Sequence, residues 1–370
     1  MMKQNKKIKI GFLIDEINIG GTENQLLKIL EYIDKNRFQV HLICLRNSNF
    51  FSTINSRGFR KTIININRLF SFKSIAGILD LIKYLRTNKI NILVTFFIDS
   101  CIYGTLAGKI AGVKVIIGTR RDLGYWYTKK LLLIFRVVNF FNRKLLVNSS
   151  AIKSNVIKFE NVNEQKINVI YNGIELTDFH RNQIIKSSIK NENIIGIVSN
   201  LNREVKRVDI FIKAANIILN RLPDVKFMVI GDGSLKSKYI SMCKEYNIIN
   251  NFNFVGSLDN VKPYLSLFTI AVNTSDSEGF SNSILEYLTM SSPVICTNTG
   301  GNREIIMHMK NGLLVPPNDE RALAEAVFYL LKHKNLRLKF ALNGQKTIGN
   351  EFAWEFRIRE YEQYFESLLN

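Results

Sequence analysis

The stretch FTIAVNTSDSEGFSNSILEY, residues 268–287, decides the fold because it joins three features in one short segment. An apolar run typical of a strand comes first, a polar loop follows, and an amphipathic helix beginning at SILEYL comes last. Ser281, Asn282 or Ser283 can cap that helix, and Ser283 with Glu286 has the spacing of a capping box. In parallel sheets, ligands bind where such helices begin, because the first amides and the helix dipole favour anions. The stretch therefore predicts an anion-binding turn in an α/β sheet.

The same alternation of strand-like and helix-like segments runs through the chain. Short β-branched runs are each followed by an amphipathic stretch, on both sides of a polar, weakly patterned segment at 176–193. This rhythm is typical of parallel sheets covered by helices. The strand-like runs are 8–14, 40–45, 90–97, 113–119 and 144–149 before that segment, and 194–199, 225–230, 252–256, 268–273, 293–297 and 312–316 after it.

A chain of 370 residues is long enough for two domains of ordinary size. We expect residues 1–178 to form the first α/β domain, 179–193 a linker, and 194–345 the second domain. The last segment, 346–370, carries aromatic and aliphatic residues at helical spacing, which predicts a C-terminal helix that packs across the domains.

Charge and cysteine content narrow the class of protein. The formal net charge is +20, and residues 1–178 hold 28 Lys or Arg against 12 Asp or Glu. Such a basic half attracts nucleic acid or anionic lipid headgroups, although solubility alone is an alternative reason for it. The four cysteines lie far apart without metal-ligand spacing, which indicates a reduced, cytoplasmic chain without a zinc site. No apolar run has the length of a membrane-spanning helix.

Glu278 and Glu286 flank the segment GFSNSIL, and SSPVICTNTGGNREII (291–306) follows them. In isolation the two glutamates fit a capped helix with one solvated carboxylate equally well. In this context the pattern resembles the signature of retaining glycosyltransferases of family 4. The resemblance implies the GT-B fold, with two Rossmann-like domains facing across a cleft. It also implies transfer of a hexose-type sugar from a nucleotide diphosphate sugar to a glycan acceptor.

The resemblance further implies a role for particular residues. Glu278 would contact the donor sugar, and Glu286 would accept hydrogen bonds from the ribose hydroxyls. Arg203 and Lys206, in IGIVSNLNREVKRVDIFIKAA (195–215), would neutralise the diphosphate. The other donor-binding positions that it implies are Gly20 and Gly21 in a glycine-rich first loop, Gly256 and Ser257 near the base, and Gly279, Phe280, Ser281 and Asn282 around the sugar and the diphosphate.

The reaction route follows from these roles. Because Glu286 would be occupied by the ribose, we do not expect the two glutamates to act as the nucleophile and acid of a retaining glycosidase. We expect attack on the same face of the sugar, with the departing diphosphate oxygen accepting the proton of the acceptor. Arg203, Lys206 and the helix N-terminus would hold the developing charge, without a metal ion or cofactor.

Two segments of the first half bear on the acceptor. Where many relatives have a histidine after the strand, this chain has Arg120 and Arg121, which could clamp an acceptor phosphate such as that of a lipid pyrophosphate. The segment LGYWYTKKLLLIFRVVNFFNRKLL (123–146) mixes aromatic and basic residues, which fits both an anionic membrane surface and ordinary core packing.

These observations predict a cytoplasmic enzyme at the inner face of the membrane that acts on a lipid-linked glycan, as in surface polysaccharide biosynthesis. A nucleotide-sugar epimerase or hydrolase on the same fold is an alternative, because the fold alone does not fix the reaction. A basic nucleic-acid-binding protein is a weaker alternative, since the sequence carries no recognised nucleic-acid motif.

Overall fold

The computed structural model describes residues 7–18, 20–66, 72–176 and 193–369. The chain divides into two compact units. Unit 1 comprises Met1–Gly173 and Glu355–Asn370, and unit 2 comprises Ile174–Trp354. The predicted linker, 179–193, lies outside the described residues except for Asn193.

Unit 1 is built on a seven-stranded sheet in which every neighbouring pair is parallel. Its strand order is β3-β2-β1-β4-β5-β6-β7, so the order reverses once, between β1 and β4. The central strands are buried along most of their length, as expected of a parallel sheet covered on both faces. The strands are β1 (Ile8–Ile14), β2 (Phe38–Cys44), β3 (Arg60–Ile63), β4 (Ile92–Phe96), β5 (Val115–Arg120), β6 (Lys144–Val147) and β7 (Ile167–Val169).

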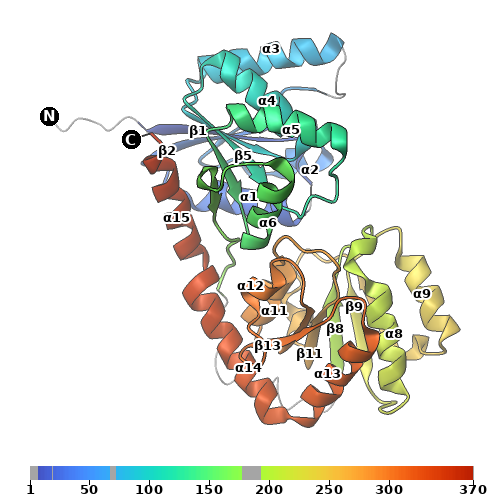
Figure 1. Ribbon diagram of the computed structural model, residues 1–370. Coiled ribbons are helices and arrows are strands. Elements are labelled where there is room, and N and C mark those ends of the chain that lie inside the picture. Colours follow the sequence, from blue (N-terminus) through green and yellow to red (C-terminus); the bar gives the residue numbers. More distant parts are fainter. Residues whose placement is uncertain (1–6, 19, 67–71, 177–192, 370) are drawn as a thin grey trace. The chain divides into compact units, whose positions relative to one another are not determined.

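The helices of unit 1 cover both faces of this sheet. Helices α3, α4 and α5 lie side by side on one face, and α1 lies on the other (Figure 1). The C-terminal helix α15 packs on the α1 side, where Phe365 contacts Phe12 of β1 and Glu362 pairs with Arg37. The helices are α1 (Gly21–Tyr32), α2 (Asn49–Thr53), α3 (Phe72–Thr87), α4 (Ile98–Ala111), α5 (Lys129–Phe141), α6 (Ser150–Asn155) and α15 (Trp354–Ser367), with a π-helical turn at Val156–Glu160.

Unit 2 repeats this plan with a six-stranded parallel sheet in the order β10-β9-β8-β11-β12-β13. Here the order reverses between β8 and β11. The strands are β8 (Ile194–Val198), β9 (Lys226–Ile230), β10 (Phe252–Gly256), β11 (Ile270–Asn273), β12 (Val294–Thr297) and β13 (Gly312–Val315). The helices are α8 (Val208–Leu219), α9 (Lys236–Glu245), α10 (Lys262–Leu265), α11 (Asn282–Thr289), α12 (Asn302–Ile305), α13 (Glu320–Lys332) and α14 (Lys334–Thr347), followed by a π-helical turn at Ile348–Phe352.

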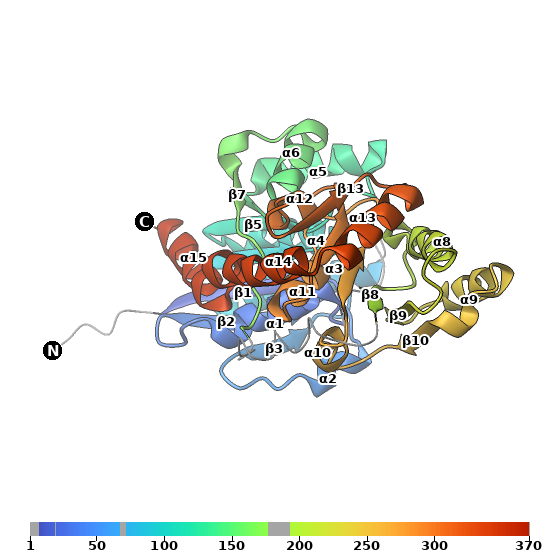
Figure 2. The same ribbon diagram turned by 90° about the horizontal axis from the view of Figure 1, so that it is seen from below.

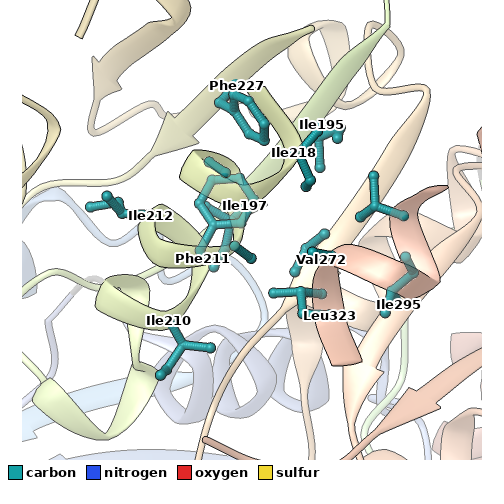
Figure 3. Close-up of a cluster of buried hydrophobic side chains, with 14 of the residues drawn as sticks. Ile195, Ile197, Ile210, Phe211, Ile212, Ile218, Phe227, Val272, Ile295 and Leu323 are labelled. Carbon is teal, nitrogen blue, oxygen red and sulfur yellow. The ribbon is translucent and has the colours of Figure 1, made fainter. Parts of the chain in front are cut away.

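A large apolar core holds unit 2 together. Helices α8 and α13 lie side by side (Figure 2) and bury their apolar faces on the sheet. Figure 3 shows Phe211 and Ile212 of α8, Phe227 of β9, Val272 of β11 and Leu323 of α13 gathered in this core. A rigid core of this kind fixes where the loops at the carboxyl ends of β8 and β11 begin.

The predicted fold class is confirmed, because both sheets are parallel and are wrapped by helices as in Rossmann-like domains. Each predicted strand is present. The sequence reading missed two strands, β3 and β7, which are only four and three residues long and lie at sheet edges. Edge strands lack the long buried β-branched run that makes central strands recognisable.

Candidate active site

The strand-order reversal of unit 2 brings together Lys206 and Glu278, which lie 72 residues apart in the sequence. Lys206 ends a 3₁₀ turn after β8, and Glu278 lies in the loop after β11. The Lys206 Nζ donates to both carboxylate oxygens of Glu278, at 2.9 and 2.8 Å. Both side chains keep some exposure to solvent, 20% for Lys206 and 11% for Glu278. A reversal of this kind is the usual ligand-binding point of an open α/β sheet.

Helix α11 begins directly behind this pair. Ser281 is its N-cap and accepts a hydrogen bond from the Ile284 amide at 3.4 Å. The predicted capping box of Ser283 and Glu286 is not formed, because Ser283 lies inside the first turn. The buried Tyr287 hydroxyl accepts from the Val198 amide at 2.6 Å, which ties α11 to the end of β8. The first amides of α11 are therefore held at the carboxyl ends of β8 and β11.

Glycines let neighbouring loops approach this site closely. A Cβ atom on Gly301 would lie 2.2 Å from the carbonyl oxygen of Gly279, so the loop after β12 packs directly on the Glu278 loop. The Gly301 amide also donates to the Glu278 carbonyl at 3.0 Å. Gly231 has a φ of +130°, and a Cβ there would lie 1.9 Å from the Ser199 carbonyl oxygen. Glycine at these two positions thus shapes the loops that carry Lys206 and Glu278.

Glu286 lies one turn into α11 and is partly buried. Burial raises the pKa of its carboxyl to about 7, and the distant charge of Lys262 only partly offsets this. A desolvated carboxyl of this kind binds ligand hydroxyl groups well, because it can accept or donate a hydrogen bond near neutral pH.

The remaining predicted donor-binding residues have varied positions. Arg203 is exposed and precedes the 3₁₀ turn that ends at Lys206. Phe280 is buried and contacts Phe352, so its ring belongs to the core, and its backbone alone borders the loop. In unit 2, Gly256 is buried and has a φ of +90°, Ser257 is exposed, and Gly279 and Asn282 are partly exposed; Gly20 and Gly21 lie in unit 1, at the start of α1.

Unit 1 has a cavity of about 430 Å³ at its own reversal point, between β1 and β4. Carboxylates and aromatic rings dominate its walls, with the hydroxyl of Thr119 among them. The buried Thr119 Oγ1 has no hydrogen-bond partner among the described residues, which leaves it available to a ligand. The residues that line the cavity, called the unit 1 cavity below, are Asp15, Phe97, Ile98, Asp99, Thr119, Arg120, Arg121, Asp122, Tyr125, Trp126, Leu131 and Phe135.

Asp15, directly after β1, is a buried carboxyl of this cavity. Burial raises the pKa of its carboxyl to about 6, and the neighbouring Asp99 carboxylate adds to the rise. The Ser100 amide donates to Asp15 at 2.6 Å, and Arg46 lies 3.5 Å away. Arg46 instead makes its close contact with Asp99, at 2.6 Å. Asp15 thus keeps acceptor capacity toward the cavity.

Strained backbone lines the same cavity. Phe97 precedes α4 with a φ of +68° and a ψ of 179°, a conformation that non-glycine residues rarely adopt. Strain of this kind costs on the order of 1–3 kcal/mol and concentrates at functional sites. It is a second observation, independent of charge, that points to the unit 1 cavity.

Arg120 is engaged inside the protein. Its Nε and Nη2 donate to the two oxygens of Glu160, each at 2.7 Å, and Nη1 donates to the Thr119 carbonyl at 2.9 Å. Burial disfavours the guanidinium charge, yet the Glu160 carboxylate raises the Arg120 pKa above its ordinary value. Tyr127 and Asn139 also donate to Glu160, at 2.6 and 2.7 Å. Arg120 therefore makes its bidentate contact with Glu160, whereas from the sequence we proposed such a contact with an acceptor phosphate.

Arg121 differs from its neighbour. Its guanidinium donates to Asn172 and to the Tyr361 hydroxyl, both at 3.2 Å. It also lies over the Phe96 ring and lines the unit 1 cavity. Its Nε is buried without a hydrogen-bond partner among the described residues. Of the two predicted acceptor-binding arginines, Arg121 is therefore the one with an N–H group available to a ligand.

Sequence reasoning missed Asp15, Phe97 and Thr119. Asp15 gave a usable signal, because it is the first acidic residue after the first strand, where a parallel sheet places its ligands. The strain at Phe97 and the unpartnered Thr119 hydroxyl have no counterpart in the sequence pattern. No group of three His, Cys, Asp or Glu side chains placed to hold a metal ion occurs among the described residues.

The two domains, each built on a Rossmann-like parallel sheet, have the architecture of the GT-B fold. A crystal structure of Anabaena HepE in complex with UDP and glucose has this fold and superposes with a TM-score of 0.83, covering 97% of this chain and 100% of HepE at 19% identity. A glycosyltransferase structure from Rickettsia africae superposes with a TM-score of 0.86, covering 99% of this chain and 100% of that one at 18% identity.

The chain belongs to glycosyltransferase family 4. Residues 19–178 match the model described as Glycosyltransferase Family 4, and residues 179–347 match the model described as Glycosyl transferases group 1. The protein is therefore a glycosyltransferase, as the sequence resemblance implied.

Curated relatives span the chain at modest identity. An Escherichia coli protein named UDP-Gal:alpha-D-GlcNAc-diphosphoundecaprenol alpha-1,3-galactosyltransferase is 25% identical over the whole of both chains. The Staphylococcus aureus capsular polysaccharide biosynthesis glycosyltransferase CapM is 26% identical, covering 72% of this chain and 74% of CapM.

Proposed function

We propose that this glycosyltransferase moves a hexose-type sugar from a nucleoside diphosphate sugar to a glycan acceptor, with retention of configuration. The observation that carries the proposal is the Lys206–Glu278 pair at the reversal point of unit 2, directly before the Ser281-capped start of α11. A cation beside helix amides is what a diphosphate needs, and a carboxylate at the same point accepts hydrogen bonds from sugar hydroxyls.

In the proposed reaction the bond between the sugar C1 and the diphosphate oxygen breaks. The acceptor hydroxyl forms a new bond to C1 on the same face, and its proton passes to the departing diphosphate oxygen. The diphosphate thus takes away both electrons of the broken bond. Lys206, Arg203 and the amides of α11 would stabilise that charge, an effect worth several kcal/mol in a preorganised site. No step requires a metal ion or another cofactor.

Each donor contact in the proposal has a distinct place. Glu278 binds the sugar. The diphosphate binds Lys206 and replaces part of the contact between Lys206 and Glu278. Glu286 binds the ribose hydroxyls, because its partly buried carboxyl has a raised pKa and no side-chain hydrogen-bond partner in the described part of the chain. Gly256 and Ser257 stay our candidates for contacts near the base.

The acceptor binds at the unit 1 cavity in this proposal. Asp15, Asp99 and Asp122 line it. Of these, Asp99 pairs with Arg46, and Arg120 is neutralised by Glu160. Carboxylates and aromatic rings suit the hydroxyls and apolar faces of a sugar ring better than they suit a phosphate. We therefore assign the cavity to the terminal sugar of the acceptor, with Arg121 as its available cation.

The relatives support a lipid-linked acceptor and a role in surface polysaccharide biosynthesis. The E. coli relative is named for a diphosphoundecaprenol-linked acceptor, and CapM is named for capsular polysaccharide. We place the reaction in the cytoplasm. No helix in the described part of the chain is long and apolar enough to cross a membrane.

Thermal unfolding in the presence of UDP-, GDP- and ADP-sugars tests the donor site. One of these donors should raise the unfolding midpoint of the wild type, because a ligand that binds the folded state stabilises it by mass action. The Glu286→Ala variant should lose most of this shift. If every nucleotide sugar leaves the wild type unshifted, the proposed donor site is wrong.

Product analysis by NMR tests the reaction. With donor and a glycan acceptor, the new linkage should keep the anomeric configuration of the donor sugar, and EDTA should leave the rate unchanged. Release of free sugar that ignores the acceptor would instead identify a hydrolase, and a donor converted to its epimer would identify an epimerase. An inverted linkage would refute the retaining route.

A further inference from the structure

Exposed apolar side chains gather on one face of unit 1. Eighteen large hydrophobic side chains are exposed in the described part of the chain, and eight of them lie on α3, α4 and α5. These three helices lie side by side on the same face of the sheet (Figure 1). The eight residues, called the α3–α5 face below, are Ile75, Leu79, Leu106, Ile110, Leu133, Val137, Phe140 and Phe141.

Helix α5 shows most clearly that this exposure is organised. Phe135 points into the domain, where it lines the unit 1 cavity and lies under Arg120. Leu133, Val137 and Phe140 follow the spacing of the opposite helix face, and they are 63%, 57% and 77% exposed. A solvated helix carries polar residues there, so contiguous apolar exposure of this kind marks an interaction surface.

Basic residues accompany these apolar side chains. On the three helices, the charged residues seen to be exposed are Lys83, Arg86, Lys109, Lys129, Lys130 and Arg136, against Asp80. Lys129, Lys130, Arg136 and Arg143 are exposed on or next to α5, a helix without any acidic residue. The partner of this face must therefore be both apolar and anionic.

We propose that the α3–α5 face docks on an anionic lipid bilayer, with Leu133, Val137 and Phe140 entering the headgroup region. Long basic side chains reach the anionic headgroups while their stems lie along apolar surface. A second copy of the chain is a poor occupant, because the face has a strong positive charge and two copies would repel. Nucleic acid would supply the charge without an apolar surface.

The structure changes which residues of 123–146 belong to such a surface. Trp126 donates its indole N–H to Asp122, and Tyr127 donates its hydroxyl to Glu160, so both take part in contacts within unit 1. Leu133, Val137 and Phe140 take their place. Because α5 also supplies Leu131 and Phe135 to the unit 1 cavity, docking would hold that cavity next to the bilayer. This last consequence rests on the proposed acceptor site.

Vesicle binding tests the docking proposal. Full-length protein is sedimented with vesicles of phosphatidylglycerol and phosphatidylcholine in equal parts, and with vesicles of phosphatidylcholine alone. The wild type should bind the anionic vesicles, and binding should fall steeply between about 0.1 M and 1 M salt, where charge screening becomes strong. The double variant Leu133→Ser with Phe140→Ser should bind at least about tenfold more weakly, because it loses two inserted apolar groups.

A matched control separates the α3–α5 face from exposed apolar surface in general. Phe356 on α15 is also in unit 1 and is 44% exposed, against 43% for Phe141. Phe356→Ser should leave vesicle binding unchanged, whereas Phe141→Ser should weaken it. All the variants should stay folded, with only a small fall in the unfolding midpoint, because the altered side chains are partly exposed.

Three results would overturn the proposal. These are a wild type that ignores anionic vesicles, a double variant that binds them as the wild type does, and a wild type that is a dimer in solution while the double variant is a monomer. Activity on a water-soluble acceptor distinguishes failure of the docking proposal from failure of the proposed function. That activity should be the same in the wild type and in the double variant.

Discussion

The two reversal points of the molecule share a topology and differ in how they treat charge. In unit 2, Lys206 and Glu278 form an ion pair that keeps contact with solvent. In unit 1, Arg120 and Glu160 form an ion pair that is almost wholly enclosed, with 4% and 0% side-chain exposure. A partly exposed pair can exchange its partner for a ligand, whereas an enclosed pair cannot leave its geometry without stranding a charge.

The difference also decides which charge faces a ligand. The loops of unit 2 present a cation and helix amides, which suit a diphosphate. In the unit 1 cavity Arg120 is neutralised by Glu160, Arg121 is the remaining cation, and Asp15 is the carboxyl that suits hydroxyl groups. One sheet plan therefore serves two kinds of ligand through the side chains placed after β1 and β8.

The sharpest way to break this comparison is to remove one partner of each pair. Glu160→Ala should cost about 3–5 kcal/mol of unfolding free energy, because it leaves Arg120 charged and buried without a partner. Glu278→Ala should cost less than about 1 kcal/mol, because its partner can turn to solvent. Urea unfolding of both variants measures the difference.

A double variant controls for lost packing at the enclosed pair. Arg120→Met with Glu160→Leu should be more stable than Glu160→Ala, since no charge is left unpaired. Equal losses for Glu160→Ala and Glu278→Ala would show that the two pairs play the same structural part.

The next largest effect concerns turnover at unit 2. Lys206→Ala should lower kcat by about 10² to 10³, the usual loss when one preorganised group that stabilises developing charge is removed. Initial rates at saturating donor measure it. Lys238→Ala is the matched control, because Lys238 also pairs with one carboxylate, Glu204 at 3.3 Å, but is 58% exposed on α9. Equal losses in the two variants would remove Lys206 from the catalytic machinery.

The sequence predicted the sheets well and their side-chain pairings poorly. Buried β-branched runs identified the central strands. The resemblance to family 4 named both Lys206 and Glu278 as donor-site residues, but it did not predict their contact across 72 residues. The ion pair of Arg120 could not be predicted from the sequence. Its partner Glu160 lies 40 residues away, at the end of a π-helical turn that has no sequence pattern. The cap of α11 could not be predicted either. Three neighbouring polar residues were equivalent candidates in the sequence, and only the backbone conformation shows that Ser281 is the N-cap.

Glu286 offers a pH-dependent test of the unit 2 site without ligand. Burial raises its pKa from 4.5 to about 7, so the folded protein holds a proton that the unfolded chain has released between these values. The contribution of this carboxyl to the free energy of unfolding is fully present below pH 4.5 and is lost as the pH rises through 7. Glu286→Gln should therefore be more stable than the wild type at pH 8, by on the order of 3 kcal/mol.

Urea unfolding of Glu286→Gln and wild type across the pH range checks this gain. The gain should vanish as the pH falls below 4.5, where both side chains are neutral. A gain that is the same at every pH would mean that the wild-type carboxyl does not titrate as proposed.

Asp15 gives a smaller effect at the unit 1 cavity. Its carboxyl has a pKa raised to about 6, so it ionises and becomes the better hydrogen-bond acceptor as the pH rises through 6. The KM for acceptor should therefore fall over that range in the wild type. Asp15→Asn should raise the acceptor KM at pH 8 by about tenfold, which corresponds to about 1.4 kcal/mol, and should abolish the pH dependence.

A matched Asp→Asn change tests whether the position matters. Asp80→Asn on α3 removes an exposed carboxylate that lies outside the unit 1 cavity, and it should leave the KM for a water-soluble acceptor unchanged. If Asp15→Asn changed the KM for donor and left that for acceptor unaltered, the assignment of the two reversal points would have to be exchanged.

The smallest expected effect compares two buried serine helix caps, one in each unit. Ser281 caps α11 in unit 2, and Ser149 caps α6 in unit 1 by accepting from the Ile152 amide at 3.1 Å. Each Ser→Ala change should cost about 1 kcal/mol of unfolding free energy, the usual worth of such a cap. Only Ser281→Ala should also raise the KM for the nucleotide sugar, because only the first amides of α11 face the proposed diphosphate. Equal stability losses together with unchanged donor KM in both variants would leave α11 as an ordinary capped helix and would remove it from the donor site.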